Sequence, residues 1–424
     1  MKKSLLFLLS LFTGAAVTAQ EDYTTVTIPL QAGYTNQVYY KFADNTQTAI
    51  PTNTWDLALL RNSTMATGIR INDARGIQVF EASSDVNDWA AINITEESNW
   101  TPLYNEETVW ETGAFDNGSA TYGWGEYNPA THHVTGSVIF VLKYTDNSYK
   151  KIIIEDYFGG YTLRYADWND TEWGADETIT VSNSQNYDNM FNYFSLESNT
   201  TVAVAPADEN WDLVFGRYYG NIGSADEPTM YLVTGVLHNS ETVSVAEMDE
   251  TGNTETDPAA PSDELFTDEI NTIGDDWKSF NMDTFTYDIN PEKTYYVKHS
   301  DGNIYRMYFT SFEGTATGNL SFNYKNITAA AGLDEVNQSV SFGLYPNPAT
   351  EKKVTLLYNL DNNAATKSTV AIYTVTGAKV FETQIADHPG FYGKELNLSH
   401  LTAGIYIVQM KAGSYQQSKK LVIK

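Results

Sequence analysis

The chain has 424 residues, which is long enough for more than one domain with its own hydrophobic core. It contains no cysteine, which excludes disulfides, thiolate metal sites, cysteine nucleophiles and the lipid-bearing cysteine of a bacterial lipoprotein. The formal net charge is −29, with 54 Asp plus Glu against 25 Lys plus Arg, and this argues against nucleic acid and anionic membrane surfaces as partners.

The first residues are predicted to be a secretory signal peptide, residues 1–19. Lys2 and Lys3 precede an apolar run from Leu5 to Val17, and cleavage is expected after Ala19. This run is too short to span a bilayer, and no later uncharged apolar run of about 18 residues follows it. We therefore expect an exported protein without a transmembrane segment.

Strand-like alternation dominates the rest of the chain. Aromatic residues make up 13% of the sequence, and segments such as VIFVLKY, KIIIEDY and TYYVKH alternate with period two between Asn, Asp and Gly turns. Convincing amphipathic helices are missing. The sequence therefore predicts an all-β protein.

One building unit occurs twice, about 155 residues apart. WDLALLR at 55–61 recurs as WDLVFGR at 211–217, and KYTDNSYKKIII at 143–154 recurs as KHSDGNIYRMYF at 298–309. VYYKF and MFNYF lie ahead of the first and the second WD, and DN and DG are expected to form tight hairpin turns at equivalent places. We expect two tandem β-rich domains, residues 20–182 and 183–328.

The Trp of each WD motif is expected to be a core anchor rather than a ligand residue. Trp55 and Trp211 are the two anchors. The Asp that follows each Trp is expected to cap a turn or to pair with the Arg that closes the motif, Arg61 or Arg217. Residues that repeat in this way indicate a shared fold and carry no chemistry by themselves.

The two units differ in their long loops. The first carries a polar and aromatic stretch between Trp89 and Val138, and the second carries an acidic loop from Glu247 to Glu269. Long loops on a rigid sheet commonly hold binding sites, so the stretch Trp100 to Tyr127 is a candidate ligand-binding region. The acidic loop is expected to be a flexible segment rather than a calcium site.

The last part of the chain differs from the rest in composition. Residues 329–343 are predicted to be a linker, and residues 344–424 hold nine Lys and no Arg against five Asp plus Glu, in strand-like segments typical of a small β-sandwich. This segment closely resembles the type A C-terminal sorting domain of the Bacteroidetes type IX secretion system. The residues that carry the resemblance are Tyr345, Pro346, Asn347, Pro348, Gly377, Gly404, Tyr406 and the terminal KKLVIK.

The sorting-domain resemblance implies a partner and a destination. The partner is the type IX secretion machinery, which takes such proteins across the outer membrane and usually removes the domain. The product is then secreted or attached to the cell surface. The resemblance implies nothing about what the exported part does.

The repeated unit resembles the HmuY-like family of Bacteroidetes, secreted β-rich proteins whose founding member binds haem. The residues that carry the resemblance are Trp55 to Ala58, Val138 to Lys151, Tyr157 and Gly160 to Tyr165 in the first unit, and Trp211 to Val214, Tyr295 to Arg306 and Gly318 to Tyr324 in the second. The fold it implies is two tandem HmuY-like β-rich domains plus the small C-terminal sandwich. The function it implies is ligand binding outside the cell.

Haem binding would require a His or Met side chain in an apolar aromatic pocket. His388 and His400 belong to the sorting domain, and His238 and His299 are expected to be surface histidines. The only pair is His132 and His133. Where the haemophore pattern leads us to expect a ligand His, after Trp124 to Tyr127, the sequence has Asn-Pro-Ala, so the transfer of ligands fails.

The haem candidates in this chain are therefore His132 or His133 together with Met65, which lies in the loop after the first WD motif. The alternative is that these are polar residues at a strand end and a loop methionine. The sequence leaves the cofactor unknown, with haem as one option, and indicates no particular metal.

An enzyme is not expected, because the chain has no GxSxG, no HExxH, no phosphate-binding Gly-rich loop and no cysteine. A ligand-binding module ranks first, with haem or surface glycans as the ligand. Glycans would require exposed Trp and Tyr faces in the aromatic stretch. A third option is an adhesive or structural surface protein without a small ligand.

Overall fold

The computed structural model describes residues 23–61, 67–183, 188–224, 227–250, 259–328, 340–350, 352–360, 368–374, 376–386, 388, 390–412 and 415–424. The chain divides into two compact units at residue 328. The predicted signal peptide, Met65 and most of the predicted linker lie outside the described residues.

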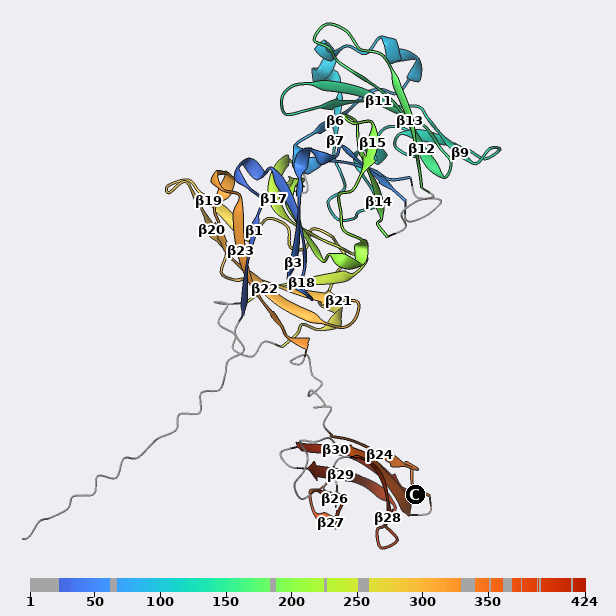
Figure 1. The fold of residues 1–424 in the computed structure, drawn as a ribbon, viewed down its shortest axis with the longest axis vertical. Helices are drawn as coiled ribbons and strands as arrows, with labels where there is room; N and C mark the ends of the chain where they lie inside the picture. Colours follow the sequence, from blue (N-terminus) through green and yellow to red (C-terminus); the bar gives the residue numbers. More distant parts are fainter. Residues whose placement is uncertain are drawn as a thin grey trace, which may run out of the picture. The chain divides into compact units, whose positions relative to one another are not determined.

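The described elements are β-strands and short 3-10 helices, which confirms the all-β prediction (Figure 1). Among the described residues, no helix has the length and apolar character needed to cross a membrane. Both predicted hairpin turns are present, with left-handed backbone at Asn147 (φ 64°) and Gly302 (φ 92°). They join equivalent strand pairs, β10–β11 and β21–β22.

One β-sandwich of the first unit is built from a continuous stretch of chain, and we name it the inserted sandwich. Its larger sheet has the order β13-β12-β11-β10-β6-β7, with the hairpin β8–β9 joined to β11, and its smaller sheet has the order β15-β14-β4-β5. The bounds are β4 Leu57–Leu60, β5 Ile69–Ile71, β6 Gln78–Ser83, β7 Thr101–Leu103, β8 Gly125–Asn128, β9 His133–Gly136, β10 Ile139–Lys143, β11 Tyr149–Tyr157, β12 Gly160–Asp167, β13 Glu177–Ser182, β14 Phe191–Ser195 and β15 Thr200–Val202.

The other sandwich, which we name the split sandwich, combines the first three strands of the chain with strands that follow residue 212. Its sheets have the orders β1-β23-β22-β21-β18 and β17-β16-β2-β3, with a separate hairpin β19–β20. The bounds are β1 Thr24–Pro29, β2 Asn36–Lys41, β3 Thr46–Pro51, β16 Leu213–Asn221, β17 Met230–His238, β18 Val243–Asp249, β19 Lys278–Asn281, β20 Thr286–Ile289, β21 Lys293–His299, β22 Ile304–Phe312 and β23 Asn319–Asn326.

Each sandwich encloses one apolar core between its two sheets. In the inserted sandwich, Leu59 of the smaller sheet packs with Phe140 and Leu163 of the larger one. In the split sandwich, Tyr40 and Phe215 pack with Phe322. The alternation read from the sequence thus places one face of each strand in a core.

The two sandwiches have the same strand order because each repeat gives its first three strands to the other. Strands β1, β2 and β3 precede the first WD motif but pair with β23 and β16, after the second. Strands β13, β14 and β15 precede the second WD motif but pair with β12 and β4, near the first. The boundary expected between residues 182 and 183 therefore falls inside the inserted sandwich.

The WD motifs hold these exchanged strands. Trp55 and Trp211 are buried, in agreement with the expected core anchors. The Asp56 carboxylate accepts a hydrogen bond from the backbone N–H of Leu196 at 2.7 Å, and Asp212 accepts one from Phe42 at 2.7 Å. Each Asp therefore fixes the end of a hairpin that belongs to the other sequence repeat.

The Arg residues that close the two motifs have other partners. Asp56 pairs with Arg75 at 2.7 Å, and the nearest cation to Asp212 is Lys41 at 3.5 Å. Arg217 donates to the carbonyl of Ala74 at 2.6 Å, in the 3-10 helix η3 (Asp73–Arg75). The sequence predicted in part that each Asp binds backbone, as a turn cap. It did not predict that the backbone belongs to a strand of the other repeat.

The second unit is a small sandwich with sheets β24-β25-β28 and β27-β26-β29-β30. The Asn347 side chain donates to the carbonyl of Lys420 at 2.7 Å and accepts from the N–H of Val422 at 2.9 Å, so the YPNP motif is tied to the terminal KKLVIK. The bounds are β24 Val340–Tyr345, β25 Lys353–Leu360, β26 Thr369–Thr374, β27 Lys379–Gln384, β28 Gly390–Asn397, β29 Gly404–Ala412 and β30 Tyr415–Ile423.

Candidate functional site

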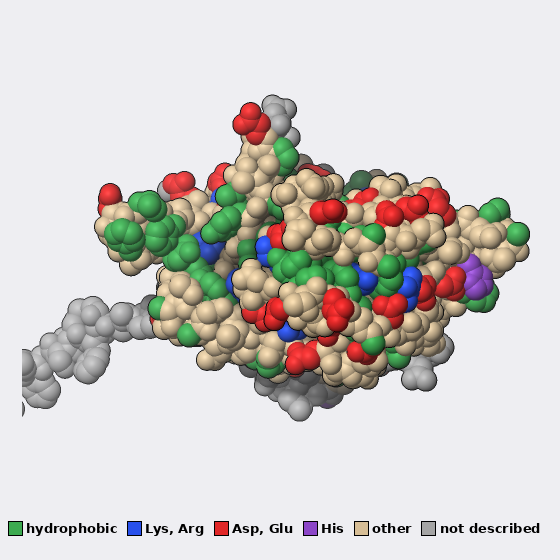
Figure 2. All heavy atoms as spheres, turned by 90° about the horizontal axis from the view of Figure 1, so that it is seen from above, with side chains coloured by type: hydrophobic (Ala, Val, Ile, Leu, Met, Phe, Trp, Pro, Cys, Tyr) green, Lys and Arg blue, Asp and Glu red, His purple; other side chains and the backbone are tan. Residues whose placement is uncertain are grey.

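The predicted histidine pair lies on a protruding hairpin, β8–β9, of the inserted sandwich. Figure 1 places β9 at the edge of the unit, and Figure 2 shows histidine and apolar side chains at that projection. His132 is exposed in the turn, with a left-handed backbone (φ 63°), and His133 begins β9. The hairpin is held by β9, which pairs with β11.

His133 is oriented by its neighbours on β11. Its Nδ1 lies 2.8 Å and 2.9 Å from the two carboxylate oxygens of Asp156. Because a carboxylate only accepts, Nδ1 carries a hydrogen, and in the neutral imidazole Nε2 is then the nitrogen with the lone pair. The imidazole stacks on Phe158, whose side chain is 63% exposed, with centroids 4.4 Å apart and an interplanar angle of 2°.

His132 faces a different partner. Its Nδ1 lies 2.7 Å from the hydroxyl of Tyr127, on the other strand of the hairpin. The two histidines thus have separate environments, because His132 lies in the turn and His133 lies on β9. Met65, the third predicted haem residue, lies outside the described residues, so its position relative to the pair stays a prediction.

A second protruding hairpin, β19–β20, lies on the split sandwich and was not singled out by the sequence. Its turn exposes Met282 (70%) and Phe285 (74%), and Phe280 on β19 is 46% exposed. Phe280 packs on Tyr287 of β20 at 5.1 Å, and Tyr287 packs on Phe312 of β22 at 4.6 Å. Figure 2 shows apolar side chains gathered at this projection, opposite the histidine hairpin.

The two hairpins occupy equivalent places in the two sandwiches. Hairpin β8–β9 follows β6 and precedes β10, and β9 pairs with β11. Hairpin β19–β20 follows β18 and precedes β21, and β20 lies against β22. Since β6, β10 and β11 correspond to β18, β21 and β22 in the shared strand order, one topological position carries both projections.

The aromatic insertion buries Trp side chains that the sequence offered as binding surface. Trp100 and Trp124, at its two ends, are buried, and Tyr122 and Tyr127 are its only large exposed aromatic residues among those described. Of the exposed Trp and Tyr faces expected for a glycan, this stretch offers Tyr122 and Tyr127, so glycan binding stays a prediction. Trp124 lies in the core between the two sheets, whereas Trp100 lies in a separate apolar cluster with Phe80 and Trp89.

The middle of the insertion joins the two sandwiches. The buried guanidinium of Arg70 donates to the carbonyls of Glu106 (3.0 Å), Val109 (2.7 Å) and Thr112 (3.0 Å), and this fixes the loop. Trp110 then reaches the split sandwich, where its Nε1 donates to the carbonyl of His238 at 2.9 Å. The long loop thus acts as a structural connection.

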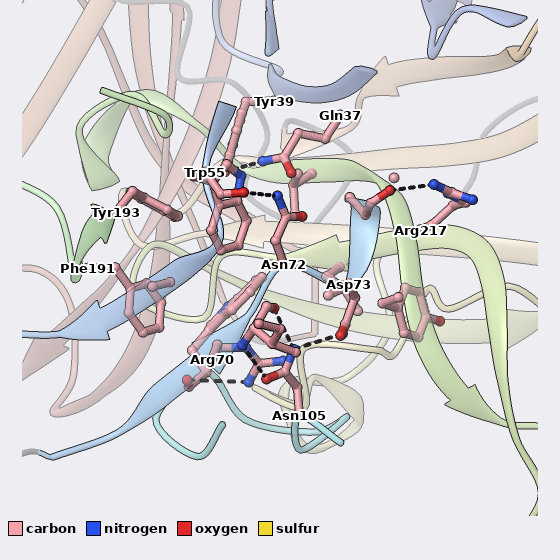
Figure 3. Close-up of a pocket in the computed structure, with 18 of the residues that line it drawn as sticks. Gln37, Tyr39, Trp55, Arg70, Asn72, Asp73, Asn105, Phe191, Tyr193 and Arg217 are labelled. Carbon is pink, nitrogen blue, oxygen red and sulfur yellow. Dashed lines mark hydrogen bonds between the residues drawn. The ribbon is translucent and has the colours of Figure 1, made fainter. Parts of the chain in front are cut away.

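A cavity of about 80 Å³ lies between the two sandwiches (Figure 3). Its walls repeat the internal symmetry: Tyr39 packs edge-on against Trp211 at 5.2 Å, and Tyr193 packs edge-on against Trp55 at 5.0 Å. Burial raises the pKa of Asp73, on its polar side, to about 6. Pockets for drug-sized ligands are about 300–1,000 Å³, so this cavity is too small for haem.

The other two histidines of the first unit, His238 and His299, lie in different environments. His238 was expected at the surface but is fully buried, and burial lowers its pKa to about 3. It shares a strand face with Val236 on β17, and that face points into the core, so the expectation is corrected. His299 lies between Asp301 (Nδ1 to Oδ1 3.1 Å) and Asp212 (Nε2 to Oδ1 3.9 Å).

Comparison with known families covers two parts of the chain. Residues 343–424 match the family described as secretion system C-terminal sorting domain. Residues 186–324 match the family described as HmuY protein. The chain joins a HmuY domain to a type IX sorting domain. It is therefore exported to the cell surface or secreted.

The HmuY match covers β14 to β23 and so follows the sequence repeat rather than either sandwich. It covers hairpin β19–β20 but not β8–β9. Only this one segment matches, so a second HmuY copy in the first repeat stays a prediction. The HmuY family consists of binding proteins rather than enzymes.

No curated protein matches the chain. A solved structure described as biofilm associated protein, BSP domain, aligns with 95% of this chain and 81% of that chain at 9% identity. Its TM-score is 0.17, which is too low to support any argument about the fold or the function.

Proposed function

We propose that this exported protein captures haem outside the cell at its protruding hairpins. The observation that carries the proposal is that one topological position presents, in each sandwich, an exposed group able to bind iron beside exposed aromatic rings. In the split sandwich that group is the thioether of Met282, and in the inserted sandwich it is the imidazole of His133. Haem iron is held by these two side-chain types.

The HmuY match supports haem as the ligand at hairpin β19–β20, because the matched segment contains it. Haem presents a large flat apolar face, and Phe280 and Phe285 offer exposed rings beside Met282, with centroids 6.5 Å apart. This is the largest group of exposed apolar side chains on a single described hairpin of the first unit. We therefore assign Met282 as the first candidate axial ligand.

The geometry of His133 supports the hairpin of the inserted sandwich. A metal-ligating histidine usually donates its second ring N–H to a carboxylate, which fixes the tautomer and increases the basicity of the ligating nitrogen. His133 and Asp156 have this arrangement, and Phe158 provides an apolar face beside the ring. Of the predicted pair, His133 is the better candidate, because the Nδ1 of His132 contacts a hydroxyl instead.

The proposal is tested by haemin titration of the full chain without its predicted signal peptide, followed through the Soret band in oxidised and reduced protein. We expect saturable binding that Met282→Ala weakens by at least about tenfold, with a smaller loss for His133→Ala. The matched variant Met282→Leu keeps the apolar volume and removes only the sulfur. His400→Ala, in the sorting domain, serves as the control for histidine number.

Binding that none of the hairpin variants alters would overturn the assignment to the hairpins. A spectrum equal to that of free haemin would reject haem as the ligand. An adhesive or structural surface role, without a small ligand, would then be the better account of the exposed apolar hairpins.

A further inference from the structure

A groove of about 510 Å³ runs along one open side of the inserted sandwich, between the edge strands of its two sheets. One wall is β13, the last strand of the larger sheet, and the other is β15, the last strand of the smaller sheet. The polar side chains that line it are Thr180, Ser182, Asn189, Asn192, Asn199, Thr200 and Thr201.

Both walls are strand edges without a further strand beside them. Among the described strands, β13 pairs only with β12 and β15 pairs only with β14. In an antiparallel pair, alternate residues point their backbone N–H and C=O groups away from the neighbour, so each wall presents a row of donors and acceptors. Neither wall carries the Lys or Pro that commonly blocks the pairing of an edge strand.

The groove differs from the rest of the surface in charge. None of the described residues that line it is Asp, Glu, Lys or Arg, although the chain holds 54 acidic and 25 basic residues. The apolar and aromatic residues that line it, which we name its floor, include Phe191, Tyr193 and Phe194 of β14. The carboxamide oxygen of Asn199 is buried there without a hydrogen-bond partner among the described residues.

The split sandwich has the same two edge strands, β1 and β3, but a side chain joins them. The Gln47 side chain on β3 donates to the carbonyl of Thr27 on β1 at 3.2 Å. The strand registers identify the equivalent positions. Gln47 pairs with Tyr40 as Thr201 pairs with Phe194, and Thr27 and Thr180 lie at the same position of β1 and β13.

The edges of the split sandwich are therefore joined, and those of the inserted sandwich left open, because of one equivalent position, which is Gln47 in the first and Thr201 in the second. The side chain of Thr201 ends at its γ atoms, whereas the amide nitrogen of Gln47 lies two bonds further from the backbone, and only Gln reaches the opposite strand. The inserted sandwich is left with two facing edges, a neutral lining and an apolar floor.

We propose that this groove binds an extended, uncharged segment of polypeptide by strand addition. Strand β13 spans six residues, so it offers an edge of about 20 Å to a bound strand. Main-chain hydrogen bonds along the edge supply the affinity, and the apolar floor receives alternate side chains of the ligand. A charged peptide would lose its hydration in the groove without gaining an ionic partner.

The test uses the full chain without its predicted signal peptide and a fluorescein-labelled, capped peptide of six alternating Thr and Val residues, matched to the length of β13. Fluorescence anisotropy is expected to show saturable binding. A peptide of the same length with alternating Glu and Val is expected to bind at least about tenfold more weakly.

The decisive variant is Thr201→Gln, which introduces the bridge seen in the split sandwich. It is expected to abolish binding while leaving the melting temperature unchanged or slightly higher, so lost binding is separated from lost folding. The matched control is Gln47→Thr, which removes the bridge in the other sandwich and is expected to keep binding at the groove. A second blocking variant, Thr180→Lys, places a charge on the β13 wall.

Three outcomes would overturn the proposal. Binding that is unchanged in both Thr201→Gln and Thr180→Lys would place the peptide elsewhere. Binding of neutral oligosaccharides but not of the peptide would make the groove a glycan site. A chain that dimerises, with the dimer lost in Thr201→Gln, would make the two edges a contact between copies of this chain. The haemin titration is independent of all three.

Discussion

The inserted and the split sandwich share their strand order but hold their common anchor differently. In the inserted sandwich, Asp56 accepts hydrogen bonds from Leu196, Arg75 and the hydroxyl of Tyr144 at 3.1 Å. In the split sandwich, Asp212 accepts the equivalent backbone bond, but its Oδ1 is buried without a hydrogen-bond partner among the described residues. The repeat preserved the backbone anchor and not the residues around it.

The same contrast holds for the surfaces. Equivalent hairpins carry His133 in one sandwich and Met282 in the other, and equivalent edge positions carry Thr201 and Gln47. Positions that hold exchanged strands kept their residue types, whereas positions that face solvent diverged. The comparison therefore separates residues needed for the fold from residues that could give each sandwich a function of its own.

The largest expected effect concerns the exchanged strands. Residues 52–205 contain every strand of the inserted sandwich, whereas residues 206–328 lack β1–β3 and with them core residues such as Val26, Ile28 and Val38. We expect residues 52–205 to fold alone and residues 206–328 to stay unfolded until a peptide of residues 23–51 is added. Thermal melting followed by circular dichroism measures both.

Cooperative unfolding of residues 206–328 without the added peptide would contradict this expectation. It would show that the strands after residue 212 form a stable structure without β1–β3. A fragment of residues 188–328 gives the matched control, because it adds β14 and β15, the equivalents of β2 and β3. If that fragment folds, β16 can pair with β14 of its own repeat about as stably as with β2 of the other repeat.

The second prediction compares the two anchors. Asp56→Ala leaves three donors without their acceptor, one of them the Arg75 guanidinium, and is expected to lower the free energy of unfolding by about 3–5 kcal/mol. Asp212→Ala leaves the N–H of Phe42 unpaired and removes the longer ion pair with Lys41, and it is expected to cost about 1–3 kcal/mol. Urea unfolding of both variants provides the comparison, and equal losses would show that the surrounding residues do not matter.

The repeat, the all-β fold and the sorting domain could be predicted from the sequence because they depend on local patterns. The exchange of strands could not, because Leu57 and Leu213 are both apolar and either could pair with Tyr40 or Phe194. The site was harder still. His133 was singled out for its residue type, but its partner Asp156 lies on another strand, and exposed Met282 has no sequence pattern that distinguishes it from a core methionine.

The third prediction concerns pH and a residue that only the inserted sandwich has. Asp116, in the aromatic insertion, accepts from the N–H of Ile69 (2.9 Å) and of Gly113 (2.7 Å), and burial raises its pKa to about 7. An unfolded Asp has a pKa of about 3.9, so the native state binds the proton more tightly. Stability is therefore expected to fall, by about 3 kcal/mol from this group, as pH rises from about 4 to about 7.

Asp116→Asn keeps an oxygen acceptor for both N–H groups and removes the titration. Urea unfolding at several pH values should show a smaller fall in stability for this variant and a higher stability than the parent above pH about 7. The fall should not vanish, because burial also raises the pKa of Asp73 and of Asp208 to about 6. An unchanged pH profile would mean that Asp116 is ionised in the native protein without cost.

The smallest expected change in stability comes from exchanging the residues beside Asp212 and Asp56, and it tests the difference between the two Asp sites most directly. His299 occupies the position of Tyr144, and its ring nitrogen lies 3.9 Å from the Oδ1 of Asp212, which has Lys41 at 3.5 Å but no hydrogen-bond partner among the described residues. His299→Tyr should bring a hydroxyl to that oxygen, as Tyr144 does for Asp56, and raise the free energy of unfolding by about 1 kcal/mol. The reverse variant, Tyr144→His, should cost a similar amount. If both variants lower the stability, the residues around Asp56 fit only Tyr144 and those around Asp212 fit only His299. The two Asp sites are then no longer interchangeable.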